Sequence, residues 1–141
     1  MEDCIFCRIV ARVTQASIVY SDEKALAFMD IQPVNTGHVL VIPTHHASRL
    51  AELDEETGAQ MFRVAMWVAE SLSLSRVKCE GVNLHLADGE AAGQEVMHVH
   101  LHIIPRFTGD GFGIRFGHHN RLKPDKKELD KVALDIRKSM S

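Results

Sequence analysis

The sequence lacks the features of a secreted, membrane-spanning or nucleic-acid-binding protein. It starts with Met1-Glu2-Asp3-Cys4, with no basic stretch followed by an apolar run, so no signal peptide is expected. No apolar run approaches the roughly 20 residues that a membrane-spanning helix needs. The net charge of -3 provides no general basic field for nucleic acid, so any recognition of phosphate must be local. Three cysteines, an odd number, favour a reducing cytoplasm over a disulfide framework.

Internal repeats and low-complexity segments are also absent, and 141 residues with 45% hydrophobic content are enough to bury one core. Apolar runs bounded by turn residues predict strands over residues 18–21, 25–29, 38–43, 81–86 and 97–105. A short helix is expected over 4–12, a long one from an N-cap at Asp54 to about Ser75, and another after Pro124. A loop is expected over 109–120. These elements predict an α+β domain with a mostly antiparallel sheet of about five strands and the helices on one face.

Histidine is unusually frequent, with nine residues, and three of them stand at alternate positions. Because side chains alternate along a strand, His98, His100 and His102 should share one face of the sheet. The apolar residues around them should point to the other face and into the core: Met97, Val99, Leu101 and Ile103. Neutral imidazole is a good nucleophile near neutral pH, and adjacent rings discourage each other from charging. The pattern predicts nucleophilic chemistry in which imidazole attacks phosphorus.

Two other interpretations of the three histidines remain open from the residues alone. They could be structural, although three at alternate positions of one strand are hard to explain by packing. They could also ligate a catalytic metal, because strand histidines bind zinc.

With these residues in view, the sequence resembles the histidine triad superfamily, whose signature His-φ-His-φ-His-φ-φ, with φ apolar, is matched completely by residues 98–104. Four further segments lie in the family's order: Cys4-Ile-Phe-Cys-Arg-Ile, Ala27-Phe-Met-Asp-Ile, Gly37-His-Val-Leu-Val-Ile-Pro and Gly93-Gln94. The resemblance covers roughly residues 3–108 and leaves 109–141 as a C-terminal extension of a single domain over 1–141. The Cys-x-x-Cys start looks like the bacterial histidine triad hydrolases. The turn over 88–94 looks more like the fragile histidine triad branch, which cleaves dinucleoside polyphosphates.

The resemblance implies a hydrolase or nucleotidyl transferase that acts at the α-phosphate of purine nucleotides. His100 would attack phosphorus and form a nucleotidyl-histidine intermediate, without a cofactor for catalysis. His102 would contact the phosphate and leaving group, and His38 would support the triad from the neighbouring strand. The resemblance also implies a homodimer, with a small nucleotide as substrate and neither nucleic acid nor membrane as partner.

The implied nucleotide-binding residues come from three segments of the chain. Asp30 would accept hydrogen bonds from ribose hydroxyls, with Ile31 beside it. The base would be walled by Ile5, Phe6, Ile9 and Phe28. The phosphate would be approached by Gly93, Gln94 and Glu95. Several of these residues also have ordinary structural interpretations: a turn aspartate for Asp30, turn geometry for Gly93, and core packing for Ile5, Phe6 and His38.

Two residues depart from the family's pattern. Ala87 stands where nucleotide-binding relatives often carry asparagine or glutamine, and Glu95 stands where many have serine or threonine. A carboxylate ~4 Å from a phosphate oxygen is repelled by about 4 kcal/mol at an effective dielectric of 20. We therefore hypothesise that Glu95 shifts the leaving-group preference away from plain polyphosphates. The departures also keep open an alternative, a nucleotide-binding protein with little turnover that acts through partners.

The Cys-x-x-Cys pair, Cys4 and Cys7, suits tetrahedral zinc but needs two more ligands. Relatives that bind zinc with cysteines and histidines at matching places make His46 and His98 the expected ligands of a structural site, and His45 is an alternative to His46. The other interpretation of the pair is two reduced thiols or a redox couple.

Overall fold

The computed structural model describes residues 3–113 and 121–140, and the chain divides into two compact units, Met1–Gly111 and Phe112–Ser141. The segment that resembles the histidine triad family was predicted to end near residue 108, close to the boundary between these units. That all 141 residues form a single domain stays a prediction. Most of the loop predicted over 109–120 lies outside the described residues. Within the described residues, no helix has both the length and the apolar character of a membrane span.

The first unit is built on a five-stranded antiparallel sheet, as predicted, with the strand order β1-β2-β3-β5-β4. The strand bounds are β1 Ile18–Ser21, β2 Ala25–Met29, β3 Val39–Pro43, β4 Gly81–His85 and β5 Leu101–Arg106. Strands β2 and β3 carry apolar residues on both faces, and β3 is buried along its whole length. Both faces of the sheet therefore need a cover.

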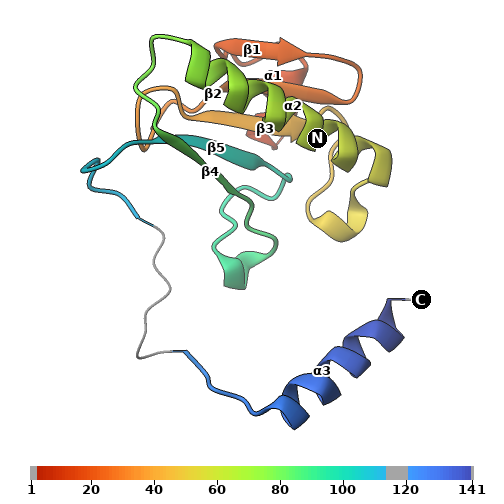
Figure 1. The fold of residues 1–141 in the computed structure, drawn as a ribbon. Helices are drawn as coiled ribbons and strands as arrows, with labels where there is room; N and C mark the ends of the chain where they lie inside the picture. Colours follow the sequence, from red (N-terminus) through yellow and green to blue (C-terminus); the bar gives the residue numbers. More distant parts are fainter. Residues whose placement is uncertain (1–2, 114–120, 141) are drawn as a thin grey trace. The chain divides into compact units, whose positions relative to one another are not determined.

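The long helix α2, Glu55–Leu74, covers one face of the sheet (Figure 1). It begins where expected, because the Asp54 side chain accepts a hydrogen bond from the Thr57 amide and caps the first turn. Its buried stripe is Met61, Val64, Ala65, Val68 and Leu72, which recurs at helical spacing. This stripe packs on the alternate strand residues Ala25, Ala27, Val39, Val41, Leu101 and Ile103.

The short helix α1, Ile5–Val10, packs on the opposite face, so the prediction that the helices share one face is wrong. Phe6 and Ile9 of α1 cluster with the strand residues of that second face: Leu26, Phe28, Leu40 and Ile42. The cause is the continuous apolar character of β2 and β3, which leaves a second buried surface that α2 cannot reach.

The strand predicted from residue 97 begins only at Leu101, so His98 and His100 precede β5. Continuing the register would place Val99 opposite Pro43, which has no N–H to donate to the ladder. The Val99 amide instead donates to the Ala47 carbonyl at 2.8 Å. Val99 is still buried in the core as expected, but Met97 is 44% exposed, so its assignment to the core is wrong.

The remaining described elements are short 3-10 turns and one further helix. The turns are η1 Leu50–Glu52 and η2 Glu90–Ala92. The second unit contains α3, Lys126–Ser139, which confirms the helix predicted after Pro124 and is capped by Asp125. Its apolar residues Leu129, Val132 and Ile136 are each more than half exposed.

Gly37, which directly precedes His38 and β3, should not tolerate a side chain. Its φ of +101° is left-handed, and an added Cβ would meet Val77 at 2.8 Å and Leu72 at 3.2 Å. Gly37→Ala should therefore lower the free energy of unfolding by about 2 kcal/mol or more in urea denaturation. Gly81→Ala is the matched control, since nothing lies within 4 Å of its Cβ position. Equal stability of the two variants would contradict this account.

Candidate active site and adjacent metal cluster

Three histidines lie on the face of the sheet that α1 covers. His100 and His102 line a cavity of about 320 Å³, whereas His98 lies deeper and is fully buried. The Phe6 ring of α1 stands edge-on to His98 and His100, with ring centroids 5.7 and 5.2 Å apart. The predicted shared face of the three histidines is confirmed, although only His102 lies within β5.

The orientation of the His100 ring is fixed by a hydrogen bond to the backbone of His98. Its Nδ1 lies 2.8 Å from the carbonyl oxygen of His98. A carbonyl only accepts, so we assign the hydrogen to Nδ1, and Nε2 keeps its lone pair. No hydrogen-bond partner of Nε2 is found among the described residues. The ring is 8% exposed and borders the cavity, so His100 presents an available lone pair from a nearly buried position.

A hydrogen bond to His38 determines which nitrogen of His102 carries the hydrogen. The Val34 amide donates to His38 Nδ1 at 3.1 Å, so the hydrogen of the neutral His38 ring is on Nε2. Nε2 lies 2.9 Å from His102 Nδ1 and donates to it. The hydrogen of His102 is therefore on its own Nε2. The supporting role expected for His38 fits this chain of hydrogen bonds, which also assigns opposite roles to His100 and His102: a lone pair and an N–H donor.

Burial keeps these rings neutral. The pKa of His102 is lowered to about 4, mainly by burial and then by the neighbouring His100, His38 and His85. Burial also lowers the pKa of His38, and the Asp30 carboxylate, 3.5 Å from its Nε2, opposes this effect. His102 is thus uncharged near neutral pH, and its single N–H, on Nε2, can donate a hydrogen bond to an anionic group.

The cavity has an apolar wall and a polar end. The apolar wall includes Ile5, Phe6, Ile9, Ala16, Phe28, Leu40 and Val96. The polar end holds the two histidines together with Asp30, His85 and Glu95. A volume of 300 to 1,000 Å³ with a few convergent polar groups is typical of small-molecule sites. The arrangement can therefore place a flat apolar group and an anionic group side by side.

The predicted base-binding residues all line this cavity, and most are also part of the core. Phe6, Ile9 and Phe28 are buried in the α1 cluster, so the packing interpretation and the binding interpretation both describe them. Ile31 lines the cavity but is 92% exposed. Asp30 also lines it, and its Oδ1 accepts from the Gln32 amide at 2.8 Å, as a turn aspartate does.

The predicted phosphate-approaching residues divide into two groups. Gly93 and Glu95 line the cavity with Ala87, and Glu95 is exposed. Gln94 is not among the residues that line the cavity, and its side chain is buried and hydrogen-bonded within the protein. Its Oε1 accepts from the Gly89 amide, and its Nε2 donates to the carbonyls of Ser48 and Val96. The Gln94 amide hydrogens are therefore not available to a phosphate, and their role is to fix the loop.

His85 is a cavity residue to which sequence reasoning assigned no role. It stands opposite His102 in the β4–β5 register, with ring centroids 5.7 Å apart. The sequence gives no sign of this neighbour, because β4 pairs with β5 only through the tertiary strand order.

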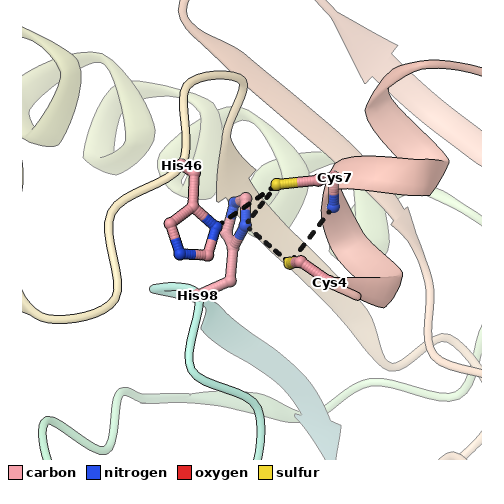
Figure 2. Close-up of side chains that lie close together, drawn as sticks. All are labelled: Cys4, Cys7, His46 and His98. Atoms are coloured by element: carbon pink, nitrogen blue, oxygen red, sulfur yellow. Dashed lines mark hydrogen bonds between the residues drawn. The ribbon is translucent and has the colours of Figure 1, made fainter. Parts of the chain in front are cut away.

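A second cluster of side chains includes His98 of the triad together with Cys4, Cys7 and His46 (Figure 2). Cys4 caps α1 and Cys7 lies in its first turn, so the Cys-x-x-Cys spacing puts both sulfurs at one end of the helix. Sγ of Cys4 is 3.3 Å from His98 Nδ1, and Sγ of Cys7 is 3.2 Å from His46 Nδ1. Tetrahedral zinc separates such ligand atoms by about 3.3 to 3.8 Å. The set matches the predicted one, and His45 is exposed and lies outside it.

The hydrogen bonds of the two histidines turn their lone pairs toward the sulfurs. His98 Nε2 donates to the Pro43 carbonyl at 3.0 Å, and His46 Nε2 contacts the Ser48 hydroxyl at 3.1 Å. The Pro43 carbonyl only accepts, so His98 keeps its Nδ1 lone pair for the cluster. The Ser48 hydroxyl can accept from His46 in the same way, as the outer partners of zinc-bound histidines do. Burial, and then the neighbouring Cys4, raise the pKa of Cys7. A cation in the cluster would instead favour the thiolate form of Cys7.

Other possible metal-binding groups fit less well. Asp30, His38 and His102 also lie close together, but Nε2 of His38 carries its hydrogen and has no lone pair for a metal. In the triad itself, the free nitrogen of His98 points at the sulfurs and that of His100 does not. The geometry does not support the three triad histidines as a joint catalytic metal site.

Comparisons with known proteins agree with this architecture. A model of the HIT domain matches residues 11–109. A HIT-like protein of Borreliella burgdorferi is 40% identical over 139 residues, which cover 96% of this chain and 100% of that one. A zinc-bound histidine triad family protein from Mycobacterium smegmatis superposes with a TM-score of 0.76 at 36% identity, covering 99% of both chains. A histidine triad nucleotide-binding protein from Candida albicans superposes with a TM-score of 0.86 at 28% identity, covering 98% of this chain and 97% of that one.

Proposed function

This chain belongs to the HIT, or histidine triad, family, and we propose that it is a nucleotide hydrolase or nucleotidyl transferase that forms a covalent intermediate on His100. Members of the family are generally hydrolases or transferases that act on nucleotides. The observation that carries the proposal is the Nε2 lone pair of His100, held toward a cavity by the hydrogen bond from Nδ1 to the His98 carbonyl.

In the proposed first step, Nε2 of His100 attacks the α-phosphorus and the leaving group departs with the electron pair of its bond to phosphorus. The attack makes the His100 ring an imidazolium, and its Nδ1–H already donates to the His98 carbonyl at 2.8 Å. This hydrogen bond strengthens as the ring becomes positive, so it stabilises the intermediate more than the free enzyme. His102 donates its Nε2–H to a phosphate oxygen. Water then attacks phosphorus and releases the nucleoside monophosphate.

The cavity supports nucleotide recognition beside this chemistry. The apolar wall around Phe6 and Phe28 suits a purine base, and the Asp30 carboxylate suits the vicinal hydroxyls of ribose. The alternative, binding with little turnover, is favoured by one feature. Ala87 and Glu95 offer no side-chain donor to phosphate, and the Gln94 donors are already engaged in the loop.

Trapping the intermediate tests the proposal. The protein is mixed with adenosine 5′-phosphoramidate or diadenosine tetraphosphate, and the reaction is stopped with acid during turnover. The mass of the protein should increase by one adenylyl group that maps to His100. His100→Ala should abolish the adduct and lower kcat/KM by roughly 10⁴-fold or more, as loss of a nucleophile does. His85→Ala is the matched control, because it removes an imidazole from the same cavity and should still form the adduct. Turnover without any adduct on His100 contradicts the mechanism, and nucleotide binding without turnover favours the alternative.

We also propose that Cys4, Cys7, His46 and His98 hold a structural zinc ion. The zinc would fix His98, whose carbonyl holds the His100 ring, and it would join α1 to the segment before β5. The thiols must stay reduced for this role, which fits the proposed cytoplasmic location.

Metal analysis should find one zinc ion per chain, and Cys7→Ser should lose it. Because zinc binds the folded chain, its loss should lower the free energy of unfolding by about 3 kcal/mol or more. His45→Ala is the control and should keep its zinc. Replacing zinc by cobalt should change kcat by less than about twofold, because a structural metal does not touch the substrate. A changed pH profile in the cobalt protein would instead indicate a catalytic metal.

The proposed partner is a second copy of this chain, docked on the outer face of α2. Phe62 and Met66 are 53% and 58% exposed on this face, one turn apart. A two-fold axis that crosses α2 between Met66 and Trp67 would bring Arg63 level with Glu70 of the second copy. The face would therefore pair opposite charges across the two-fold axis.

Sedimentation velocity should show a dimer for the wild type and a monomer for Met66→Glu at the same concentration. An unpaired carboxylate in this interface should weaken association by about 100-fold or more. Ser71→Glu is the control, since it adds the same charge on the flank of α2 and should leave the dimer intact. A monomeric wild type would refute this partner.

A further inference from the structure

The tautomer of His38 depends on the turn that precedes β3, over residues 34–38. The Val34 amide donates to His38 Nδ1 at 3.1 Å, and the His38 amide donates to the Asn35 carbonyl at 3.1 Å. An N–H group that faces Nδ1 excludes a hydrogen on that nitrogen, so the hydrogen stays on Nε2 and is directed to His102. The position of one backbone amide thus decides whether His102 offers an N–H or a lone pair to the cavity.

The Asn35 side chain ties this turn to the end of β5. Its Nδ2 donates to the Pro105 carbonyl at 2.9 Å and to Asp110 Oδ2 at 2.8 Å. Both partners only accept, so the nitrogen of the carboxamide must face them, and both of its hydrogens are used. Among the hydrogen bonds of the described residues, no other side chain of residues 32–36 takes part. Asn35 is therefore the polar anchor of the turn.

Asp110 is a buried acceptor whose orientation is fixed by Arg106. The side chain of Asp110 is only 3% exposed. Arg106 binds it in a bidentate way, with Nε 2.6 Å from Oδ2 and Nη2 2.7 Å from Oδ1. The Phe107 amide also donates to Oδ2. Arg106 itself is held on its other side, because its Nη1 donates to Asn83 Oδ1 of β4 at 2.7 Å. A bidentate pair fixes the plane of the carboxylate, so Oδ2 stays directed to Asn35.

We propose that Asn35, held by Asp110 and Arg106, is a positioning residue that fixes the tautomer of the pair His38 and His102. It does not touch the cavity, since it is not among the residues that line it. It acts through the turn, by keeping a backbone N–H against His38 Nδ1. The effect on turnover rests on the proposed function, whereas the tautomer can be measured without any substrate.

Loss of the anchor allows the two rings to exchange their roles. When the Val34 amide leaves Nδ1, His38 can carry its hydrogen there, and Nε2 becomes an acceptor. His102 then donates from Nδ1 to His38 and keeps a lone pair on Nε2, which repels the phosphate oxygen that the N–H would bind. Each ring keeps one hydrogen throughout. The Asp30 carboxylate, 3.5 Å from His38 Nε2, opposes the exchange, so the expected result is a mixture of tautomers.

Nitrogen NMR of the folded protein, labelled with ¹⁵N in its histidines, measures the tautomers. A ring nitrogen that carries a hydrogen and one that carries a lone pair have well separated shifts, and the variants His38→Gln and His102→Gln identify the two rings. Near neutral pH the wild type should carry the hydrogen on Nε2 in both. Asn35→Ala should change the ratio of the two tautomers by about fivefold or more, which corresponds to one net hydrogen bond. The shifts of Nδ1 and Nε2 should then move toward each other in both rings.

Asn83→Ala is the matched control. It removes a carboxamide from Arg106 in the same network and leaves both hydrogen bonds of Asn35 in place. It should lower the midpoint of urea denaturation as Asn35→Ala does, yet keep the wild-type nitrogen shifts. Asn35→Ser keeps one donor, so its shifts should lie between those of the wild type and Asn35→Ala, and it carries the test if Asn35→Ala does not fold.

The kinetic consequence is proportional to the tautomer population. The kcat/KM for adenosine 5′-phosphoramidate should fall by the same factor as the fraction of His102 with its hydrogen on Nε2, because only that fraction is competent. Unchanged shifts in the Asn35 variants, or equal changes in Asn83→Ala, overturn the positioning role and leave the proposed function standing. The expected shifts in every variant, together with no turnover and no adduct on His100, overturn the proposed function and leave the positioning role standing.

Discussion

The hydrogen bond from His100 Nδ1 to the carbonyl of His98 is the interaction on which the rest of this site depends. It decides which nitrogen of His100 keeps a lone pair and fixes the plane in which that lone pair points. The same bond connects two functions, because the His98 ring faces the cysteines while its carbonyl faces the nucleophile. One residue thus belongs to the Cys/His cluster and also orients the ring of the proposed nucleophile, His100.

Proline provides the geometric reason for this arrangement. Pro43 ends β3 and has no amide hydrogen, so the ladder between β3 and β5 stops before it reaches Val99. Its carbonyl is left free and accepts from His98 Nε2 instead. Residues 98–100 therefore precede β5, and the carbonyl oxygen of His98 lies 2.8 Å from Nδ1 of His100.

His100 and His102 have complementary chemistry because the groups that they hydrogen-bond to differ. His100 donates to a carbonyl and keeps an acceptor, whereas His102 accepts from His38 and keeps a donor. Burial holds His102 neutral by lowering its pKa to about 4. The cavity beside this pair has an apolar wall that includes Phe6 and Phe28.

The sequence by itself determined the local features of this protein. Apolar periodicity gave α2 and its Asp54 cap, alternation placed three histidines on one face, and the Cys-x-x-Cys spacing brought two sulfurs to one helix end. The hydrogen-bond partners of the polar side chains depend on the tertiary structure. In the folded chain the Gln94 amide is hydrogen-bonded within the loop, His85 lies beside His102, and His46 rather than His45 lies in the Cys/His cluster. The physical reason is that propensity and periodicity act over neighbouring residues, whereas these contacts depend on strand order and on the end of the ladder at Pro43.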